Sequence, residues 1–521
     1  MMRYRGLALA LMLLFAGTAA PQTGTAQPPA PTVLRVTVDV PGAQEVHTPR
    51  EYNRAIALRY FSVGTSAPRA VLVLIPGLNS GPNTLDILAR ELVVHDPTIE
   101  VWAAGTRGTL LQDRRGITAA LAYEDPDFAL GYYYGGLAID GVKYAPLTDT
   151  AAYFAAYWGL DVHLRDVRAL VEEAHRRYPT ARVFLGGHSL GGILAALYAG
   201  YDFGRLPDPQ AEVATDPRGR PVPSMDAGDR DIAGLVLLDG LPLSVIPRLT
   251  SSQYLEGIHI PLFPSIPGVR QLLGIGGHAG PFADIDSVAH PKDSILLDII
   301  TTYAYFWPQR ASRLPFYPRG AGQAITNEAL LAGVLSDQTQ PDLFIRASIG
   351  VPVGIFERVP DPWSINRNGL LKMSTGRPAP GRALVEWTPY PKDPPPGHVD
   401  LRRLESAILE PGADFTQWYV PWRLVLDLGL SAGLDTSDEF SRGFASLTQV
   451  RHTTVPILIL GAGRGLIRTA RQTAFYLSRI ETPAAEVRVR ILPGLTHLDI
   501  ENADDNPAVQ EILDWVDGVL H

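Results

Sequence analysis

The sequence contains no cysteine among its 521 residues. This absence excludes disulfide bonds, cysteine nucleophiles and thiolate metal ligands in one step. The fold must therefore be stabilised by its core and packing, which a chain of this length can provide. Hydrophobic residues make up 46% of the chain, as in ordinary globular proteins.

Signatures of metal and nucleotide binding are also missing. There is no H-E-x-x-H pattern, and the 12 histidines are dispersed along the chain. The glycine-rich run at residues 461–465 lacks the G-x-G-x-x-G spacing of dinucleotide-binding loops, so we expect no cofactor and no metal. The net charge of −9 argues against nucleic acid as the main partner.

The chain begins with a hydrophobic run that is too short to span a membrane with polar flanks. Two arginines lie within residues 1–5, residues 6–16 are apolar, and small residues follow. This order is typical of a secretory signal. We predict a signal peptide over residues 1–26, a secreted or periplasmic protein, and no stable membrane span after cleavage. An uncleaved signal anchor is the alternative.

Strands and helices alternate at both ends of the remaining chain. Buried-strand runs lie at residues 69–75, 99–103, 181–185, 231–238 and 455–460, and helical patterns at 83–94, 161–178, 469–480 and 506–520. Such alternation predicts a mainly parallel sheet with helices on both faces. The proline- and aromatic-rich interval 241–450 breaks this rhythm. We expect it to be a cap inserted between core segments 27–240 and 451–521.

The most informative motif is Gly187-His188-Ser189-Leu190-Gly191, a G-x-S-x-G pattern. A short apolar strand precedes it and an apolar helix follows it. A serine in a sharp strand-to-helix turn has its hydroxyl exposed at the end of the sheet, and its strained backbone requires small neighbours. In this setting the motif indicates a catalytic nucleophile rather than a simple glycine turn.

These residues resemble the nucleophile elbow of the α/β-hydrolase superfamily, and most closely that of its secreted bacterial lipase- and esterase-like members. The resemblance covers about residues 69–240 and 455–521. It implies an α/β-hydrolase fold with a mainly parallel, eight-stranded sheet. It also implies that the catalytic groups follow in the order serine, acid, histidine.

The catalytic base is expected in the loop after the last strand, where His497 lies. The family usually places its acid after the penultimate strand, but that loop here contains no carboxylate. Asp239, which ends the strand after the elbow, is our predicted acid, because some members of the superfamily carry their acid at this strand. Asp499 and Glu501 remain alternatives because they follow His497 closely. His188, inside the elbow, is expected to have a packing or supporting role.

An oxyanion hole requires two backbone amides aimed at the developing charge. We predict the amides of Leu190, which follows the nucleophile, and Leu78, in the loop after the strand at residues 69–75. Arg107 could hold a substrate carboxylate, although a structural ion pair is the preferred interpretation. The aromatic runs at residues 132–134 and 303–307 could line an acyl pocket or pack in the core.

These features predict a secreted serine hydrolase that cleaves carboxylic esters through Ser189, His497 and Asp239. Its partner is a small-molecule or lipid-like ester, and the oligomeric state is not predicted. Two alternatives remain. The same triad could serve an amide or peptide hydrolase, or the chain could be a non-catalytic binding member of the fold.

Overall fold

A computed structural model describes most of the chain after residue 31. The described residues are 32–206, 213–242, 248–258, 266–275, 277–283, 291–314, 324–338, 340, 343–353, 356–357, 377–378, 384–388, 397–434 and 446–521. The predicted signal peptide lies outside them. None of the described helices is long and apolar enough to span a membrane.

Eight strands form one central sheet in the order β1-β2-β4-β3-β7-β8-β14-β15. β2 runs antiparallel to both of its neighbours, and the remaining pairs of the sheet are parallel. This order confirms the predicted α/β-hydrolase fold. The strands are β1 Val33–Pro41, β2 Arg54–Ser62, β3 Ala70–Ile75, β4 Ile99–Gly105, β7 Arg182–His188, β8 Leu235–Leu238, β14 Ile457–Ala462 and β15 Val487–Leu492.

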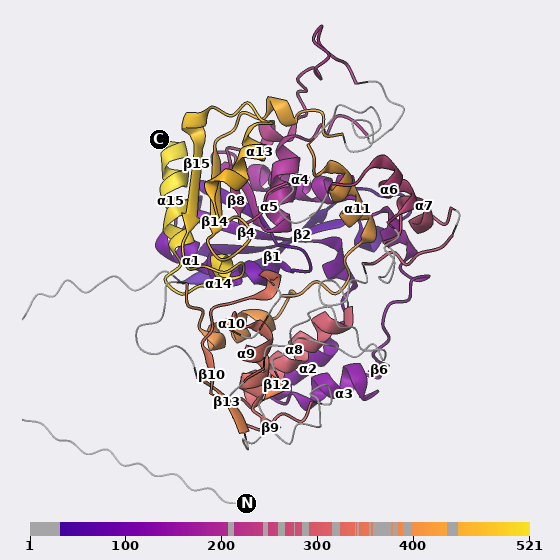
Figure 1. Cartoon of the computed structure of the whole chain (residues 1–521), viewed down its shortest axis with the longest axis vertical. Coiled ribbons are helices and arrows are strands. Elements are labelled where there is room, and N and C mark those ends of the chain that lie inside the picture. The colour runs from indigo at the N-terminus through magenta and orange to yellow at the C-terminus, as the bar shows by residue number, and fades with distance from the viewer. Residues whose placement is uncertain are drawn as a thin grey trace, which may run out of the picture.

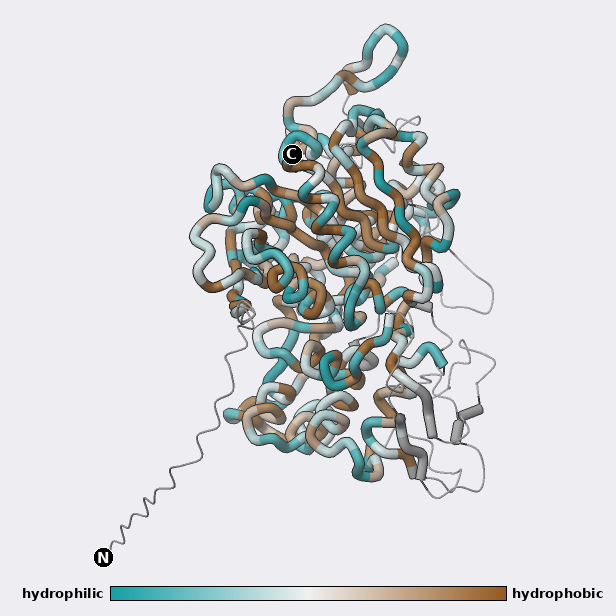
Figure 2. The backbone as a smooth tube through the Cα atoms, turned by 90° about the vertical axis from the view of Figure 1, so that its left-hand side faces the viewer, coloured by the Kyte–Doolittle hydropathy of each residue, from teal (hydrophilic) through white to brown (hydrophobic). Residues whose placement is uncertain are grey.

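The central strands are buried on both faces, which explains their nearly continuous apolar sequence. Alternate residues point to opposite sides, so Leu72 and Leu74 belong to one hydrophobic cluster and Val71 and Val73 to another. These strands are among the most continuously hydrophobic stretches of the backbone (Figure 2).

Helices cover both faces of the sheet (Figure 1). Residues of α1 and α15 join the first cluster, and residues of α4 and α5 join the second. The bounds are α1 Asp86–His95, α4 Leu160–Arg177, α5 Leu190–Ala199, α13 Ala474–Leu477, α14 Asp499–Asn502 and α15 Pro507–Leu520. The helix predicted at residues 469–480 is only a 3-10 turn at Ala470–Thr473 followed by the short α13.

A second body lies below the carboxyl ends of the strands in Figure 1. Both the interval after β4 and the interval after β8 contribute to it. Its helices are α2 Arg115–Tyr123, α3 Asp127–Tyr134, α8 Pro291–Phe306, α9 Asn327–Leu335 and α10 Leu401–Leu409. Its short strands are β5 Ala138–Ile139, β6 Val142–Lys143, β9 Ala324–Ile325, β10 Val351–Val353, β11 Phe356–Glu357, β12 Arg377–Pro378 and β13 Leu384–Thr388.

Three more helices of the interval after β8 lie beside the sheet rather than below it (Figure 1). They are α6 Ser251–Glu256, α7 Val269–Leu272 and α11 Trp422–Ser431, and they share a separate hydrophobic cluster.

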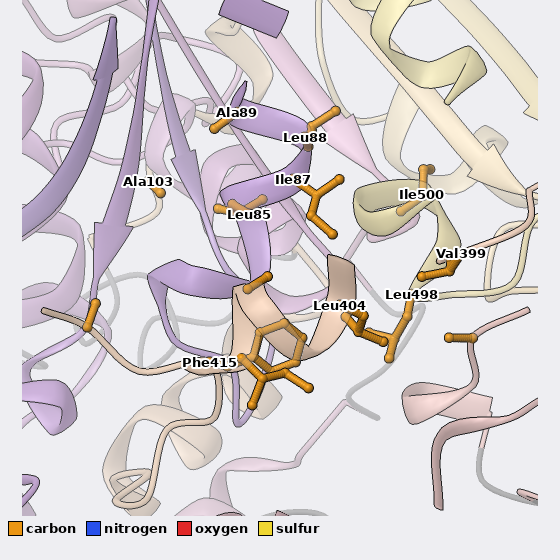
Figure 3. Packing of buried hydrophobic residues seen from close by; sticks show 14 of the residues in the cluster. Leu85, Ile87, Leu88, Ala89, Ala103, Val399, Leu404, Phe415, Leu498 and Ile500 are labelled. Atoms are coloured by element: carbon orange, nitrogen blue, oxygen red, sulfur yellow. The ribbon is translucent and has the colours of Figure 1, made fainter. Parts of the chain in front are cut away.

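The second body and the sheet domain share one hydrophobic cluster. Figure 3 shows Leu404 of α10 beside Leu498, which precedes α14, with Val399 close to both. The second body is therefore packed against the core of the sheet domain.

Candidate active site

Ser189 lies between the end of β7 and the start of α5, where the sequence predicts a sharp turn. Its backbone has φ 54° and ψ −117°, a conformation that non-glycine residues rarely adopt. A Cβ on Gly187 would come within 2.5 Å of the Ile75 carbonyl oxygen, so the elbow tolerates no side chain there. The strain at Ser189 and the crowding around it are those of a nucleophile elbow.

The loop after β3 lies directly against this serine. A Cβ added to Gly77 would meet the Ser189 Cβ at 3.2 Å. Within the described part of the chain, the amides of Leu78 and Leu190 donate to no protein acceptor. The structure thus leaves both predicted oxyanion-hole donors available beside the serine.

His497 lies next to the elbow and is buried. Its ring centroid is 4.3 Å from that of His188, the residue before Ser189. Its Nδ1 is 2.6 Å from Oδ2 of Asp239. The structure therefore pairs the predicted base with the predicted acid, and it places the His497 ring against the residue that precedes the predicted nucleophile.

Asp239 is fully buried at the end of β8. Besides His497, it accepts the amides of Ala462 at 3.0 Å and of Leu466 and Ile467 at 2.8 Å each. Burial by itself would raise the pKa of Asp239. The bond and charge of His497, together with the amides of Leu466 and Ile467, outweigh burial and lower that pKa. Asp239 therefore remains ionised and can orient the imidazole.

The loop after β14 has a role that its sequence did not predict. This glycine-rich loop lacks the carboxylate that the family pattern leads one to expect, and instead supplies amides that hold Asp239. A Cβ on Gly465 would collide with the Asp239 carboxylate, so glycine is needed for this approach. The run of glycines at residues 461–465 was the available signal.

Burial lowers the pKa of His497 to about 4, and the charge of His188 acts in the same direction. The bond to Asp239 opposes both effects. A histidine with a lowered pKa is neutral near neutral pH, which is the form required of a general base.

The two alternative acids lie elsewhere. Asp499 accepts the Ser348 amide at 2.8 Å, the Ser348 hydroxyl at 2.7 Å and the Thr496 amide at 2.7 Å. Glu501 lies 3.1 Å from Nδ1 of His188. Neither carboxylate is hydrogen-bonded to His497 within the described residues.

The insertion, which is the interval between β8 and β14, contacts both loops of the site. These are the loop after β3, called the oxyanion loop, and the loop after β15 that carries His497, called the histidine loop. The Gly81 amide donates to the Phe415 carbonyl at 2.7 Å, and the Gln417 amide donates to the Asn79 carbonyl at 3.0 Å. On the other side, the Thr496 hydroxyl donates to the Arg346 carbonyl at 2.6 Å. The oxyanion loop and the histidine loop are thus both held by hydrogen bonds to the insertion.

Arg107 forms the expected structural ion pair. It is buried, and its Nε lies 2.6 Å from Asp166, while its Nη1 donates to Asn53 at 2.7 Å. These bonds join the loop after β4 to α4 and to the turn before β2, and they do not leave the guanidinium free for a substrate.

The aromatic runs are mainly structural. Tyr132 and Tyr133 are buried in the large cluster, and their hydroxyls both bond to Asp113. In α8, Ser294 contacts the oxyanion loop at Asn79, but Tyr305 lies eleven residues further along, about 16 Å of helix rise. Tyr305 therefore lies about three helical turns away from the contact between α8 and the loop after β3.

Phe344, in the insertion, packs edge-on against His497 with centroids 5.9 Å apart. No pattern in the sequence pointed to this residue, because its neighbourhood has no regular periodicity.

No protein-family model and no curated protein matches the sequence. Solved structures do match it. A candidate lipase from Sulfolobus solfataricus is 15% identical, with 93% of this chain and 94% of that chain covered and a TM-score of 0.47. A peroxisomal α/β-hydrolase from Saccharomyces cerevisiae is 11% identical, with 94% and 90% covered and a TM-score of 0.40. A monoglyceride lipase variant from Saccharomyces cerevisiae is 12% identical, with 89% and 92% covered and a TM-score of 0.36. Sequence identities and TM-scores this low do not indicate the substrate of this protein.

Proposed function

We propose that this protein, which has the α/β-hydrolase fold, is a serine hydrolase that cleaves carboxylic esters. One observation carries the proposal. A serine in a strained elbow lies beside two backbone amides that have no acceptor among the described residues, and beside a buried histidine–aspartate pair. These are the nucleophile, the oxyanion donors and the oriented base that acyl transfer requires.

The proposed reaction has two halves. Ser189 Oγ attacks the ester carbonyl carbon while His497 takes the hydroxyl proton, and the amides of Leu78 and Leu190 stabilise the resulting oxyanion. When the tetrahedral intermediate collapses, His497 returns the proton to the departing alcohol. Water then attacks the acyl-enzyme in the same way and releases the acid.

The nucleophile type supports an ester hydrolase over a dehalogenase, whose elbow residue is an aspartate. Against a purely binding role, the strained φ of Ser189 and the short His497–Asp239 bond favour a working site.

A matched pair of substrates tests the proposal. An aryl ester and the corresponding aryl amide should be assayed with the wild-type protein and with Ser189→Ala. We expect ester hydrolysis that falls by several orders of magnitude in the variant, because the nucleophile carries most of the acceleration. Faster turnover of the amide would favour a peptide or amide hydrolase. Equal turnover by the wild-type protein and the variant would contradict the assignment of Ser189.

The N-terminal sequence supports a second proposal, that the protein is exported and loses residues 1–26. The intact mass of the protein recovered from an exporting cell tests it. A full-length mass would indicate an uncleaved anchor.

A further inference from the structure

His188 is a second histidine buried in the site, and both of its ring nitrogens face acceptors. Nδ1 lies 3.1 Å from Oε2 of Glu501, and Nε2 lies 3.0 Å from the carbonyl oxygen of His497. A neutral imidazole carries a single N–H and can donate to only one acceptor. Nδ1 and Glu501 are within ion-pair distance without an aligned hydrogen bond, so the buried carboxylate favours the doubly protonated, cationic ring through its charge.

Glu501 needs this cation. Its side chain is fully buried in α14, four residues after His497. Among the ion pairs of the described residues, His188 is its basic partner. A buried carboxylate without a partner destabilises the fold because it has lost its hydration. Removing one member of a buried ion pair leaves the other charge with this desolvation penalty.

We propose that His188 and Glu501 form a buried imidazolium–carboxylate pair that positions the His497 loop against the nucleophile elbow. The pair joins two segments more than 300 positions apart in sequence, since His188 ends β7 and Glu501 lies in α14. Through Nε2, His188 also holds the backbone of His497 itself. The catalytic part of this inference rests on the proposed function, whereas the charge state of His188 does not.

The pair has an electrostatic consequence for the base. The titratable groups facing His188 are Glu501 from α14, His497 from the preceding loop and Asp239 from the end of β8. Burial by itself would lower the pKa of His188, but the charge of Glu501, aided by that of Asp239, raises it. The resulting positive charge lies beside His497 and disfavours a second imidazolium there. His497 therefore stays neutral at pH values below those at which histidines usually become protonated.

Glu501→Gln tests this arrangement because the pair and a direct effect of Glu501 on His497 predict opposite changes in the pKa of His497. If Glu501 acted directly on His497, removing its negative charge would lower the pKa of His497. In the proposed pair, its removal leaves His188 without a partner, so the buried ring becomes neutral and no longer opposes protonation of His497. The acid limb of kcat/KM should then move to higher pH, by about one unit.

Two further variants sharpen the result. His188→Gln should move the acid limb in the same direction as Glu501→Gln. Asp505→Asn removes the same charge from an exposed position four residues away, where the backbone conformation suits asparagine, and should leave the limb in place. A limb that moves to lower pH in Glu501→Gln, or does not move, would overturn the effect on His497.

The charge state of His188 is measured without any substrate. In protein labelled with ¹⁵N-histidine, the imidazole signals lost in His188→Gln should show two protonated nitrogens at pH 7. The same signals should become those of a neutral ring in Glu501→Gln. A neutral, single-tautomer His188 in the wild-type protein would overturn the pair. This readout also separates the two proposals, because an inactive wild-type protein with a cationic His188 would refute only the hydrolase assignment.

Discussion

At the scale of single residues, the acid was the hardest residue of the site to predict. The sequence offered Asp239, Asp499 and Glu501, and spacing alone could not choose among them. The structure gives each a different partner: His497, Ser348 and His188 respectively. The choice depends on where strands that are distant in sequence end, which local sequence does not encode.

The Asp239→Asn variant tests this assignment. An amide can hold the imidazole in the wrong tautomer while keeping its shape, so we expect kcat to fall by about 10⁴-fold. Asp499→Asn, which alters a buried carboxylate with no bond to His497, should cost far less. Steady-state kinetics at pH 8 on both purified proteins measure this. Near-wild-type kcat in Asp239→Asn would remove Asp239 from the triad.

At the scale of elements, the strands and the long helices were predictable. Continuous apolar runs mark β3, β8 and β14, and the one-sided apolar pattern of α4 extends over its whole length. Short elements were not predictable, because two or three residues carry no measurable period. The predicted helix at residues 469–480 is present only as the 3-10 turn Ala470–Thr473 and the four-residue α13, although a capping box at Thr469 marks its predicted start.

The segment around Ser348 connects the insertion to the histidine loop. The amide and the hydroxyl of Ser348 donate hydrogen bonds to the Asp499 carboxylate. The Thr496 amide donates a third hydrogen bond to the same carboxylate. Ser348→Ala removes one hydrogen bond to a buried carboxyl group, so we expect a loss of about 1–2 kcal/mol in the free energy of unfolding. Because the triad is untouched, kcat should fall by less than about tenfold.

Chemical denaturation of this variant should be compared with Ser406→Ala. Ser406 is an exposed residue within α10, and its hydroxyl donates to the Arg402 carbonyl of the same helix. The control should be nearly as stable as the wild-type protein. Equal stability of the two variants would show that the Ser348 contact contributes nothing.

At the scale of the whole molecule, the insertion and the sheet domain behave as one packed unit. They share a hydrophobic cluster, and hydrogen bonds from the insertion hold both loops of the site. The sequence indicated that an insertion exists but not how it packs. Its contacts join positions such as Gln112 and Asp414, which are about 300 residues apart.

Asp298 in α8 makes the stability of this unit depend on pH. Burial raises the pKa of Asp298 to about 7, with Arg114 as its partner at 3.5 Å. The unfolded carboxyl has a pKa near 3.8. Between these two values the native state binds a proton that the unfolded state has lost, so this group's contribution to stability falls as pH rises toward 7.

Asp298→Asn should remove this dependence. From pH 5 to pH 8, the free energy of unfolding of the variant should gain about 2 kcal/mol relative to the wild-type protein. Denaturation curves at both pH values measure the change, and Asp514→Asn on the exposed face of α15 is the matched control. A constant difference between variant and wild type would mean that Asp298 does not titrate in this range.

The central claim is that Ser189 is an activated nucleophile. The most direct measurement is mass mapping of the adduct formed with a fluorophosphonate, which reacts only with an activated serine. The account predicts one adduct, located on the peptide containing Ser189, lost in Ser189→Ala and much slower to form in Asp239→Asn. A folded wild-type protein that remains unlabelled, or an adduct that persists in Ser189→Ala, would contradict it.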